Sequence, residues 1–176
     1  MGFGTFIEGK AFKVVDERVM RLSALFILMI AVTAFVNGFI LNNFSVLPYI
    51  IGFVWLNFII GLFIDLNYSP TVALANIILS KKITKPIGAI QKKFAWGLGL
   101  TLSSVILVLS ILLSWNPGLF NAVCLLCLIC IGIIFFEVAF KVCIGCELYF
   151  QSIKLKILKE PKPEERPNCM GDSCEI

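Results

Sequence analysis

Histidine is absent from this chain, and cysteine is absent from its first 123 residues. Without histidine, imidazole-based acid/base catalysis and a Ser-His-Asp triad are excluded. The sequence also has no phosphate-binding loop and no carboxylate pair placed to face a pocket, so hydrolase and nucleotide-driven functions are not indicated. All seven cysteines gather in the last 53 residues. This pattern points to thiol chemistry or to the handling of a soft metal.

Apolar residues dominate the composition. The chain is 59% hydrophobic with a mean hydropathy of +0.97, against roughly 45–50% apolar residues in soluble domains. A membrane-spanning helix needs about 20 apolar residues, and four stretches are long enough, at about 19–41, 46–64, 94–114 and 119–140. The sequence therefore predicts an all-α membrane protein with four transmembrane helices.

The positive charges are distributed on one side of this arrangement. The fifteen lysines and arginines precede or open the first span, lie between the second and third, or follow the fourth. The loops on the other side, around 42–45 and 115–118, carry no charge. The positive-inside rule then predicts that both termini and the central loop are cytoplasmic, in a bacterial inner membrane. Topology accounts for the excess of lysine and arginine over acidic residues. We therefore expect the lipid bilayer as a partner and no nucleic acid.

The domain organisation follows from the spans. We expect a cytoplasmic N-terminal segment at 1–18, a transmembrane domain at 19–150 and a flexible, cysteine-containing cytoplasmic tail at 151–176. Asp16 and Glu17 suit the start of the first helix. Ser69 and Pro70 have the signature of a cap and a first helical position, which predicts a short interfacial helix between spans two and three.

Several polar or small residues inside the spans are expected to serve helix packing. The amide of Asn57 favours a hydrogen bond to a neighbouring helix over a substrate site. Small residues from Gly97 to Ser104 predict that this face of the third span packs against another helix. Lys92 and Lys93 are expected at the depth of the lipid headgroups.

The sharpest motif is Cys143-Ile144-Gly145-Cys146. Two cysteines separated by two residues have the spacing of a redox dithiol or of half a metal site. Gly145 removes a side chain beside the second sulfur, and Lys141 supplies a charge that favours a thiolate. At the C-terminal end of the fourth helix, however, the helix dipole would disfavour a thiolate. Function and coincidence both remain open for this motif.

Cys124, Cys127 and Cys130 recur at intervals of three inside the fourth span. On a helix, such pairs have Cβ atoms roughly 5–6 Å apart. A relaxed disulfide needs about 3.5–4.5 Å, so this spacing fits a dithiol or a metal better. These cysteines form a possible relay, or they act as small hydrophobic side chains.

Glu137 and Lys141 lie one helical turn apart near the cytoplasmic boundary. They form either an ordinary surface pair or charge partners for the thiols. Cys169 and Cys174 lie in the tail, and a flexible linker of about 23 residues reaches on the order of 25–30 Å. The tail cysteines could therefore exchange with the Cys143–Cys146 pair, or they could be passive.

Three segments resemble a bacterial membrane family catalogued as domain of unknown function 4395, and the resemblance covers roughly 10–150. They are 15–22 (VDERVMRL), 91–99 (QKKFAWGLG) and 141–149 (KVCIGCELY). The family's closing Cys-x-Gly-Cys and aromatic correspond to Cys143, Gly145, Cys146 and Tyr149. The family often has Pro-Lys-Arg-Phe where this chain has Gln91-Lys92-Lys93-Phe94, so the proline is not shared. The resemblance implies the membrane topology, and the family has no settled activity.

Our leading hypothesis is a thiol-based redox or sulfur-transfer relay. Cys143 and Cys146 would exchange electrons or sulfur with a soluble thioredoxin-like or sulfurtransferase partner, and no cofactor is expected. From Cys130 to Cys143 is about 20 Å along a helix, while thiol exchange needs contact between sulfurs. A complete relay across the membrane therefore needs movement or a carried small molecule.

Two alternatives stay open. In the first, Cys143 and Cys146 bind a soft metal, Cu(I) or Hg(II), in a binding or transport protein. In the second, the chain is a non-catalytic membrane assembly subunit. Whether the protein is an enzyme is left open by these hypotheses.

Overall fold

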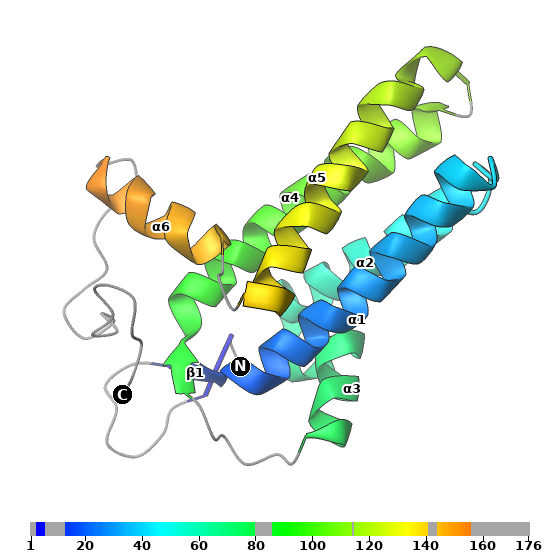
Figure 1. Cartoon of the computed structure of the whole chain (residues 1–176). Helices are drawn as coiled ribbons and strands as arrows, with labels where there is room; N and C mark the ends of the chain where they lie inside the picture. The colour runs from blue at the N-terminus through cyan, green and yellow to red at the C-terminus, as the bar shows by residue number, and fades with distance from the viewer. Residues whose placement is uncertain (1–2, 6–12, 80–85, 114, 141–143, 156–176) are drawn as a thin grey trace.

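Four long apolar helices run back and forth along one axis in the computed structural model (Figure 1). The structure describes residues 3–5, 13–79, 86–113, 115–140 and 144–155. The first two spans are α1 (Glu17–Phe35), extended by a π-helical turn to Ile40, and α2 (Leu47–Ile59), extended in the same way to Ile64. The second two are α4 (Ala89–Leu113) and α5 (Phe120–Phe140). The predicted four spans are thus confirmed, and the protein is a multi-pass membrane protein.

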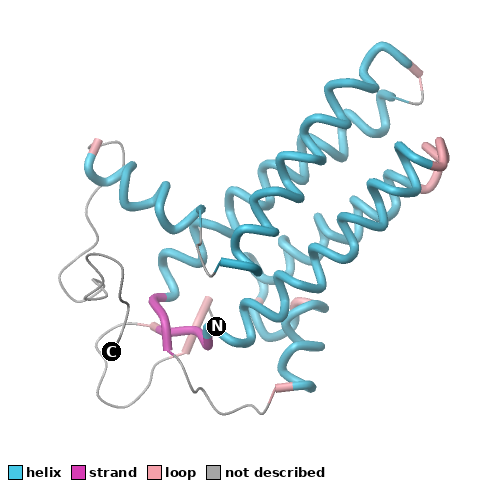
Figure 2. Tube along the Cα trace, viewed as in Figure 1, coloured by secondary structure: helices cyan, strands magenta, loops and turns pink. Residues whose placement is uncertain are grey.

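The four spans form a ring in which α1 packs against α2 and α5, and α4 packs against α2 and α5. The two short turns between paired spans share one end of the molecule (Figure 2). The remaining elements gather at the other end: α3 (Pro70–Ile78) packs on α1, and α6 (Ile144–Lys154) packs on α4. The lysines and arginines that the structure describes also lie at this second end, so it is the end predicted to be cytoplasmic.

Helix starts follow the expected signals with one difference. Asp16 caps α1, its carboxylate accepting a hydrogen bond of 2.9 Å from the Arg18 N–H. Ser69 and Pro70 open α3 as predicted, but the Ser69 hydroxyl does not cap that helix and instead donates to Asn57 Oδ1 at 2.8 Å. Asn57 Oδ1 also accepts from the backbone N–H and hydroxyl of Thr71, both at 3.0 Å. Asn57 thus has the packing role expected from the sequence, because its amide oxygen binds a neighbouring helix.

A two-stranded antiparallel sheet joins segments that the sequence analysis left separate. β1 (Val14–Asp16) pairs with β2 (Pro86–Gly88), with Val15 opposite Ile87. Thr5 and Val14 exchange two further backbone hydrogen bonds of 2.9 Å. Part of the N-terminal segment predicted at 1–18 is therefore tied to the start of α4.

Trp96 of α4 lies at the centre of the larger core cluster. Its ring meets Phe58 edge-on at 5.2 Å and Phe3 at 5.9 Å. A second cluster, which includes Leu47, Ile106 and Val123, fills the bundle toward the short turns. The interior between these clusters is incompletely filled, and that space is where the chemically distinctive residues meet.

Candidate functional site

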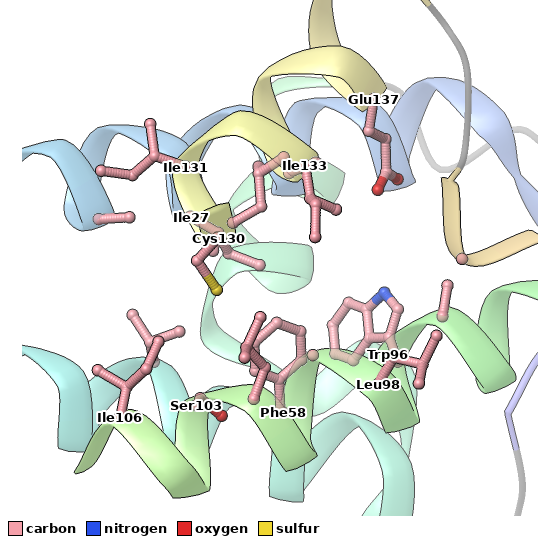
Figure 3. A pocket seen from close by; sticks show the side chains of 18 of the residues that line it. Ile27, Phe58, Trp96, Leu98, Ser103, Ile106, Cys130, Ile131, Ile133 and Glu137 are labelled. Carbon is pink, nitrogen blue, oxygen red and sulfur yellow. The ribbon is translucent and has the colours of Figure 1, made fainter. Parts of the chain in front are cut away.

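A cavity of about 170 Å³ lies along the axis of the bundle. Its walls come from α1, α2, α4 and α5, and the first turns of α6 close one end. Most of the lining is aliphatic or aromatic, as Figure 3 shows for Ile27, Phe58 and Ile106. The few polar or thiol groups along it include Cys127, Cys130 and Glu137. A cavity of this composition favours an apolar occupant with a polar group at one end.

Two of the three cysteines in the fourth span face this cavity. Cys127 and Cys130 line it as free thiols, and Figure 3 shows the Cys130 sulfur pointing inward. Cys124, also a free thiol, is half-buried and does not line it. The three predicted relay cysteines therefore divide into two that border the cavity and one that does not.

Glu137 marks the end of the cavity nearest α6 and forms an ion pair with Lys92 of α4. The side chain of Lys92 is only 7% exposed and that of Glu137 23%. The ammonium group of Lys92 is held inside the bundle by the carboxylate, whereas Lys93 is exposed, and the headgroup depth expected for the two lysines stays a prediction. Lys141, the charge partner suggested for Glu137, lies outside the described residues.

The sequence contains a signal for Lys92 that was not used. Positions 92, 96, 99, 103 and 106 recur at helical intervals of three and four residues. Trp96, Gly99, Ser103 and Ile106 on this stripe all line the cavity. A helical projection of α4 would have placed Lys92 on the inward face and Lys93 outside it.

The end of α5 is stabilised by a second cation. Arg21 of α1 donates two hydrogen bonds to the carbonyl of Val138, from Nε at 3.0 Å and from Nη2 at 2.8 Å. A cation at the last carbonyls of a helix satisfies unpaired acceptors and interacts favourably with the dipole. α5 is described to Phe140, and a separate helix, α6, is described from Ile144.

This break changes the environment of the Cys-x-x-Cys motif. The sequence analysis placed the motif at the C-terminal end of the fourth span, but Cys146 lies in the first turn of α6. The positive end of the helix dipole is there, so the direction of the electrostatic effect is reversed. Cys146 is partly buried and is disulfide-bonded. Cys143 lies outside the described residues, as do Cys169 and Cys174 of the tail.

Gly145 brings α6 against α4. A Cβ atom at Gly145 would lie 2.6 Å from the Cβ of Ala95 and 2.8 Å from its Cα, distances that no real side chain tolerates. The crossing is completed by the rings of Phe94 and Tyr149, whose centroids are 5.4 Å apart. Gly145 therefore lets the backbone beside Cys146 form part of the cavity wall. This requirement for close packing is more specific than the local loosening of the helix expected from the sequence.

The arrangement thus assembles several predicted residues around one space. Cys127, Cys130, Glu137 and Gly145 border the cavity, and Cys146 directly follows Gly145 in the chain. Among the described residues, no group of three or more cysteine or acidic side chains is arranged to hold a metal ion. The geometry can support thiol–disulfide exchange at the end of the bundle where α6 lies and binding of a small apolar molecule along the axis.

Among the comparisons with known proteins, only a family model matches the chain. Neither the curated proteins nor the solved structures contain a match to it. The match that exists covers residues 15–154, from β1 through the end of α6, and so includes every element described above. That match is to the family model described as Domain of unknown function (DUF4395), and the chain belongs to this family.

Proposed function

We propose that this protein is a thiol-based relay of the bacterial inner membrane. In this proposal, Cys143 and Cys146 exchange electrons or sulfur with a soluble thioredoxin-like or sulfurtransferase partner at the cytoplasmic face. The observation that carries the proposal is the disulfide-bonded state of Cys146 in the first turn of α6, beside the wall of the central cavity.

The position of Cys146 supports nucleophilic thiol chemistry. The attacking species in disulfide exchange is the thiolate, and its negative charge is stabilised by unpaired backbone N–H groups and by the dipole at a helix N-terminus. Cys146 in its reduced form would have this stabilisation, because α6 begins only two residues before it. Had α5 continued through the motif, the same dipole would have acted against the thiolate.

Access to a soluble partner is the second requirement. Exchange proceeds through a mixed disulfide and needs direct contact between sulfurs. α6 follows the last span and leaves the bundle at the end proposed to be cytoplasmic (Figure 1), and Cys146 is only partly buried there. In the redox form of the relay, a partner dithiol is oxidised to a disulfide while a disulfide proposed to join Cys143 and Cys146 is reduced to a dithiol. Cys169 and Cys174 are proposed as a tethered second pair for the same exchange.

A trapping experiment tests the proposal. In a redox pair, replacing one cysteine leaves the other unable to resolve a mixed disulfide, so either Cys143→Ser or Cys146→Ser should accumulate a covalent adduct with a thioredoxin-like protein. The matched control is Cys124→Ser, which removes a free thiol that does not line the cavity. Non-reducing electrophoresis after acid quenching measures the adduct.

Redox titration of the purified full-length protein provides an independent readout. We expect a two-electron couple that is present in Cys124→Ser and lost in Cys146→Ser. Bound Cu(I) with no adduct and no couple would overturn the proposal in favour of a soft-metal protein. Uniformly slow alkylation of all cysteines, again without a couple, would overturn it in favour of an assembly subunit.

A further inference from the structure

We propose that the cavity along the bundle axis binds one neutral, straight-chain molecule of about seven carbon atoms, with a hydroxyl group at the end nearest Glu137. Such a molecule is a medium-chain alcohol that enters from the bilayer. Its binding is independent of the thiol relay, because no cysteine of the Cys-x-x-Cys motif takes part. Three properties of the described residues support it: the volume of the cavity, its length, and a carboxylate oxygen that is left without a partner.

The volume of the cavity limits the occupant to a few carbon atoms. An apolar cavity of about 150 Å³ holds benzene, which corresponds to roughly 25 Å³ for each carbon atom of the ring. The cavity in this bundle measures about 170 Å³, so on the same basis it holds about seven carbon atoms. A membrane lipid with two long acyl chains is therefore too large to be the occupant.

This volume is extended along the bundle axis. On α5 the lining includes Cys127 and Glu137, and on α4 it includes Trp96 and Ile106. The residues of each pair are about 15 Å apart along their helix at 1.5 Å per residue, whereas a spherical cavity of about 150 Å³ is only about 7 Å across. Figure 3 shows this extension, with Ile106 and Trp96 toward opposite ends of the cavity. A narrow space of this shape favours a single chain over a ring with the same number of atoms.

The middle of the cavity suits methylene groups. The Ser103 hydroxyl already donates to a carbonyl of its own helix at 2.9 Å, and the Ser23 hydroxyl lies 2.7 Å from that of Thr71. Cys127 and Cys130 line the same stretch as free thiols, which behave as small hydrophobic side chains. A polar group bound at this depth would lose its water without gaining a strong partner.

Glu137 gives one end of the cavity a different chemistry. Its Oε1 atom pairs with the Lys92 ammonium, whereas its Oε2 atom has no partner among the residues that the structure describes. Figure 3 shows the carboxylate directed into the space between α5 and α4. An ionised carboxylate accepts hydrogen bonds but donates none, and Lys92 already balances its charge. This end therefore selects a neutral hydrogen-bond donor, for which a hydroxyl group is small enough.

Two lining residues mark the route from the bilayer. Leu98 of α4 is 39% exposed and Leu148 of α6 is 44% exposed, although both also border the cavity. The entrance therefore lies between α4 and α6, at the end where Glu137 is found. A molecule that enters here with its apolar end first leaves its hydroxyl group beside the carboxylate.

Three molecules built from the same numbers of carbon and oxygen atoms test the shape and the donor separately. In n-heptanol the chain and the donor are both present, hexyl methyl ether has no donor, and benzyl alcohol replaces the chain by a ring. The full-length protein in nanodiscs is treated with a small lipid-soluble alkylating reagent, and mass spectrometry gives the reaction rate at each cysteine. Cys130 faces the cavity, whereas Cys124 does not line it and reports partitioning of the reagent in the same sample.

We expect n-heptanol above its dissociation constant to slow the alkylation of Cys130 about fivefold or more, and that of Cys124 less than about twofold. At matched concentrations in the bilayer, hexyl methyl ether should need about a tenfold higher concentration for the same protection, because it cannot donate to Glu137. Benzyl alcohol should also protect less, because its ring is wider than the chain.

A matched pair of substitutions on α4 tests the location. Ser103 and Thr101 each donate a 2.9 Å hydrogen bond to a carbonyl of their own helix, but Ser103 lines the cavity and Thr101 is exposed on the outer surface. Ser103→Leu fills the space, so n-heptanol should no longer change the Cys130 rate, whereas Thr101→Leu should keep the protection within roughly twofold of wild type. Thermal unfolding of the wild-type protein is a second readout, in which n-heptanol should raise the Tm more than its ether isomer does.

Protection of Cys130 that is selective for n-heptanol and is lost only in Ser103→Leu supports the proposal. Equal slowing at Cys124 and Cys130 indicates partitioning into the bilayer alone and overturns it. Equal protection by benzyl alcohol overturns the straight-chain occupant, and equal protection by the ether overturns the role of Glu137. If Ser103→Leu does not fold or Cys130 does not react, equal Tm shifts with the alcohol and the ether overturn the proposal. The mixed disulfide and the two-electron couple of the thiol relay involve other cysteines, so each idea can fail without the other.

Discussion

At the scale of single residues, the Lys92–Glu137 pair has the largest energetic consequence. Both charges are removed from most of their water, and the cost of that desolvation is offset only while the two groups stay together. Breaking such a pair by removing one partner typically costs about 3–5 kcal/mol, whereas replacing both partners by apolar groups is often neutral. A single substitution in this pair should therefore destabilise the protein much more than the matching double substitution.

We predict that Glu137→Gln lowers the free energy of unfolding by about 3 kcal/mol, because it leaves the Lys92 ammonium buried without a counter-charge. The double variant Lys92→Met/Glu137→Leu should recover most of this loss. Unfolding by denaturant in mixed micelles measures both. Lys93→Met is the control, because this lysine is exposed and a surface substitution changes stability by about 0.5 kcal/mol or less. Equal losses in the single and double variants would contradict the interpretation.

The sequence analysis identified Glu137 as a charged residue of interest and considered Lys141, which lies outside the described residues, as its partner. Lys141 is four residues away in the sequence, whereas Lys92 is 45 residues away on another helix. Helical periodicity reports which residues share a face of one element, and it cannot report which faces of two elements meet. The inward position of Lys92 was thus predictable, but its pairing with Glu137 required the packing of α4 against α5.

At the scale of elements, α3 depends on one amide of α2. The Oδ1 atom of Asn57 accepts three hydrogen bonds from the start of α3, and the Ser23 hydroxyl of α1 meets the Thr71 hydroxyl at 2.7 Å. A nine-residue helix is too short to be stable alone in water. Its position therefore rests on this polar contact and on the buried side chains of Val72 and Ala75.

Replacing Asn57 by alanine should release α3 locally. The loss of these acceptor contacts is expected to cost about 2 kcal/mol, and amide hydrogen exchange within 70–78 should accelerate on the order of 30-fold while the spans change little. Asn37→Ala serves as the control, because that amide bonds only to the carbonyl of Thr33 on its own helix. Exchange that rises equally in α3 and in α4 would argue against a local role.

The crossing of α6 over α4 gives a second test at this scale. Gly145→Ala would place a Cβ atom 2.6 Å from that of Ala95, so it should destabilise the crossing by about 1–3 kcal/mol, the range for overpacking. Gly132→Ala is the matched control: no atom lies within 4 Å of its added Cβ, and alanine should stabilise the helix by up to about 1 kcal/mol. Thermal unfolding compares the two, and Gly145→Ala/Ala95→Gly should regain part of the loss. Identical behaviour of the two single variants would refute the close approach.

The elements differ in how well the sequence predicts them. Long apolar runs identified all four spans, and the cap signals placed the starts of α1 and α3. The strands β1 and β2 have three residues each and pair across two spans, so neither alternation nor a turn signal was available to detect them. The start of α6 was missed because the apolar run continues into the Cys-x-x-Cys motif. Near the last described turn of α5, Arg21 of α1 contacts the Val138 carbonyl, a tertiary contact that no local sequence signal reports.

At the scale of the whole molecule, orientation in the bilayer is the property on which every proposed role depends. The turns around 42–45 and 115–116 share one end, and α3, the sheet and α6 share the other (Figure 2). We predict that reporter fusions at Asn43 and Asn116 report the periplasmic side, and that fusions at Lys82 and after Ile176 report the cytoplasmic side. A periplasmic signal from the C-terminus would overturn the topology and the proposed partner.

The sheet has a consequence for biosynthesis. β1 leaves the ribosome before α1, but its partner β2 follows only after two spans and α3 have been made, roughly 70 residues later. At about 5–20 residues per second, the N-terminal strand waits on the order of 4–14 s for its partner. During that interval, the first helical hairpin must already sit correctly in the bilayer without the sheet to hold it. The pairing of β1 with β2 is thus a late step that joins the first hairpin to the second as the nascent chain continues.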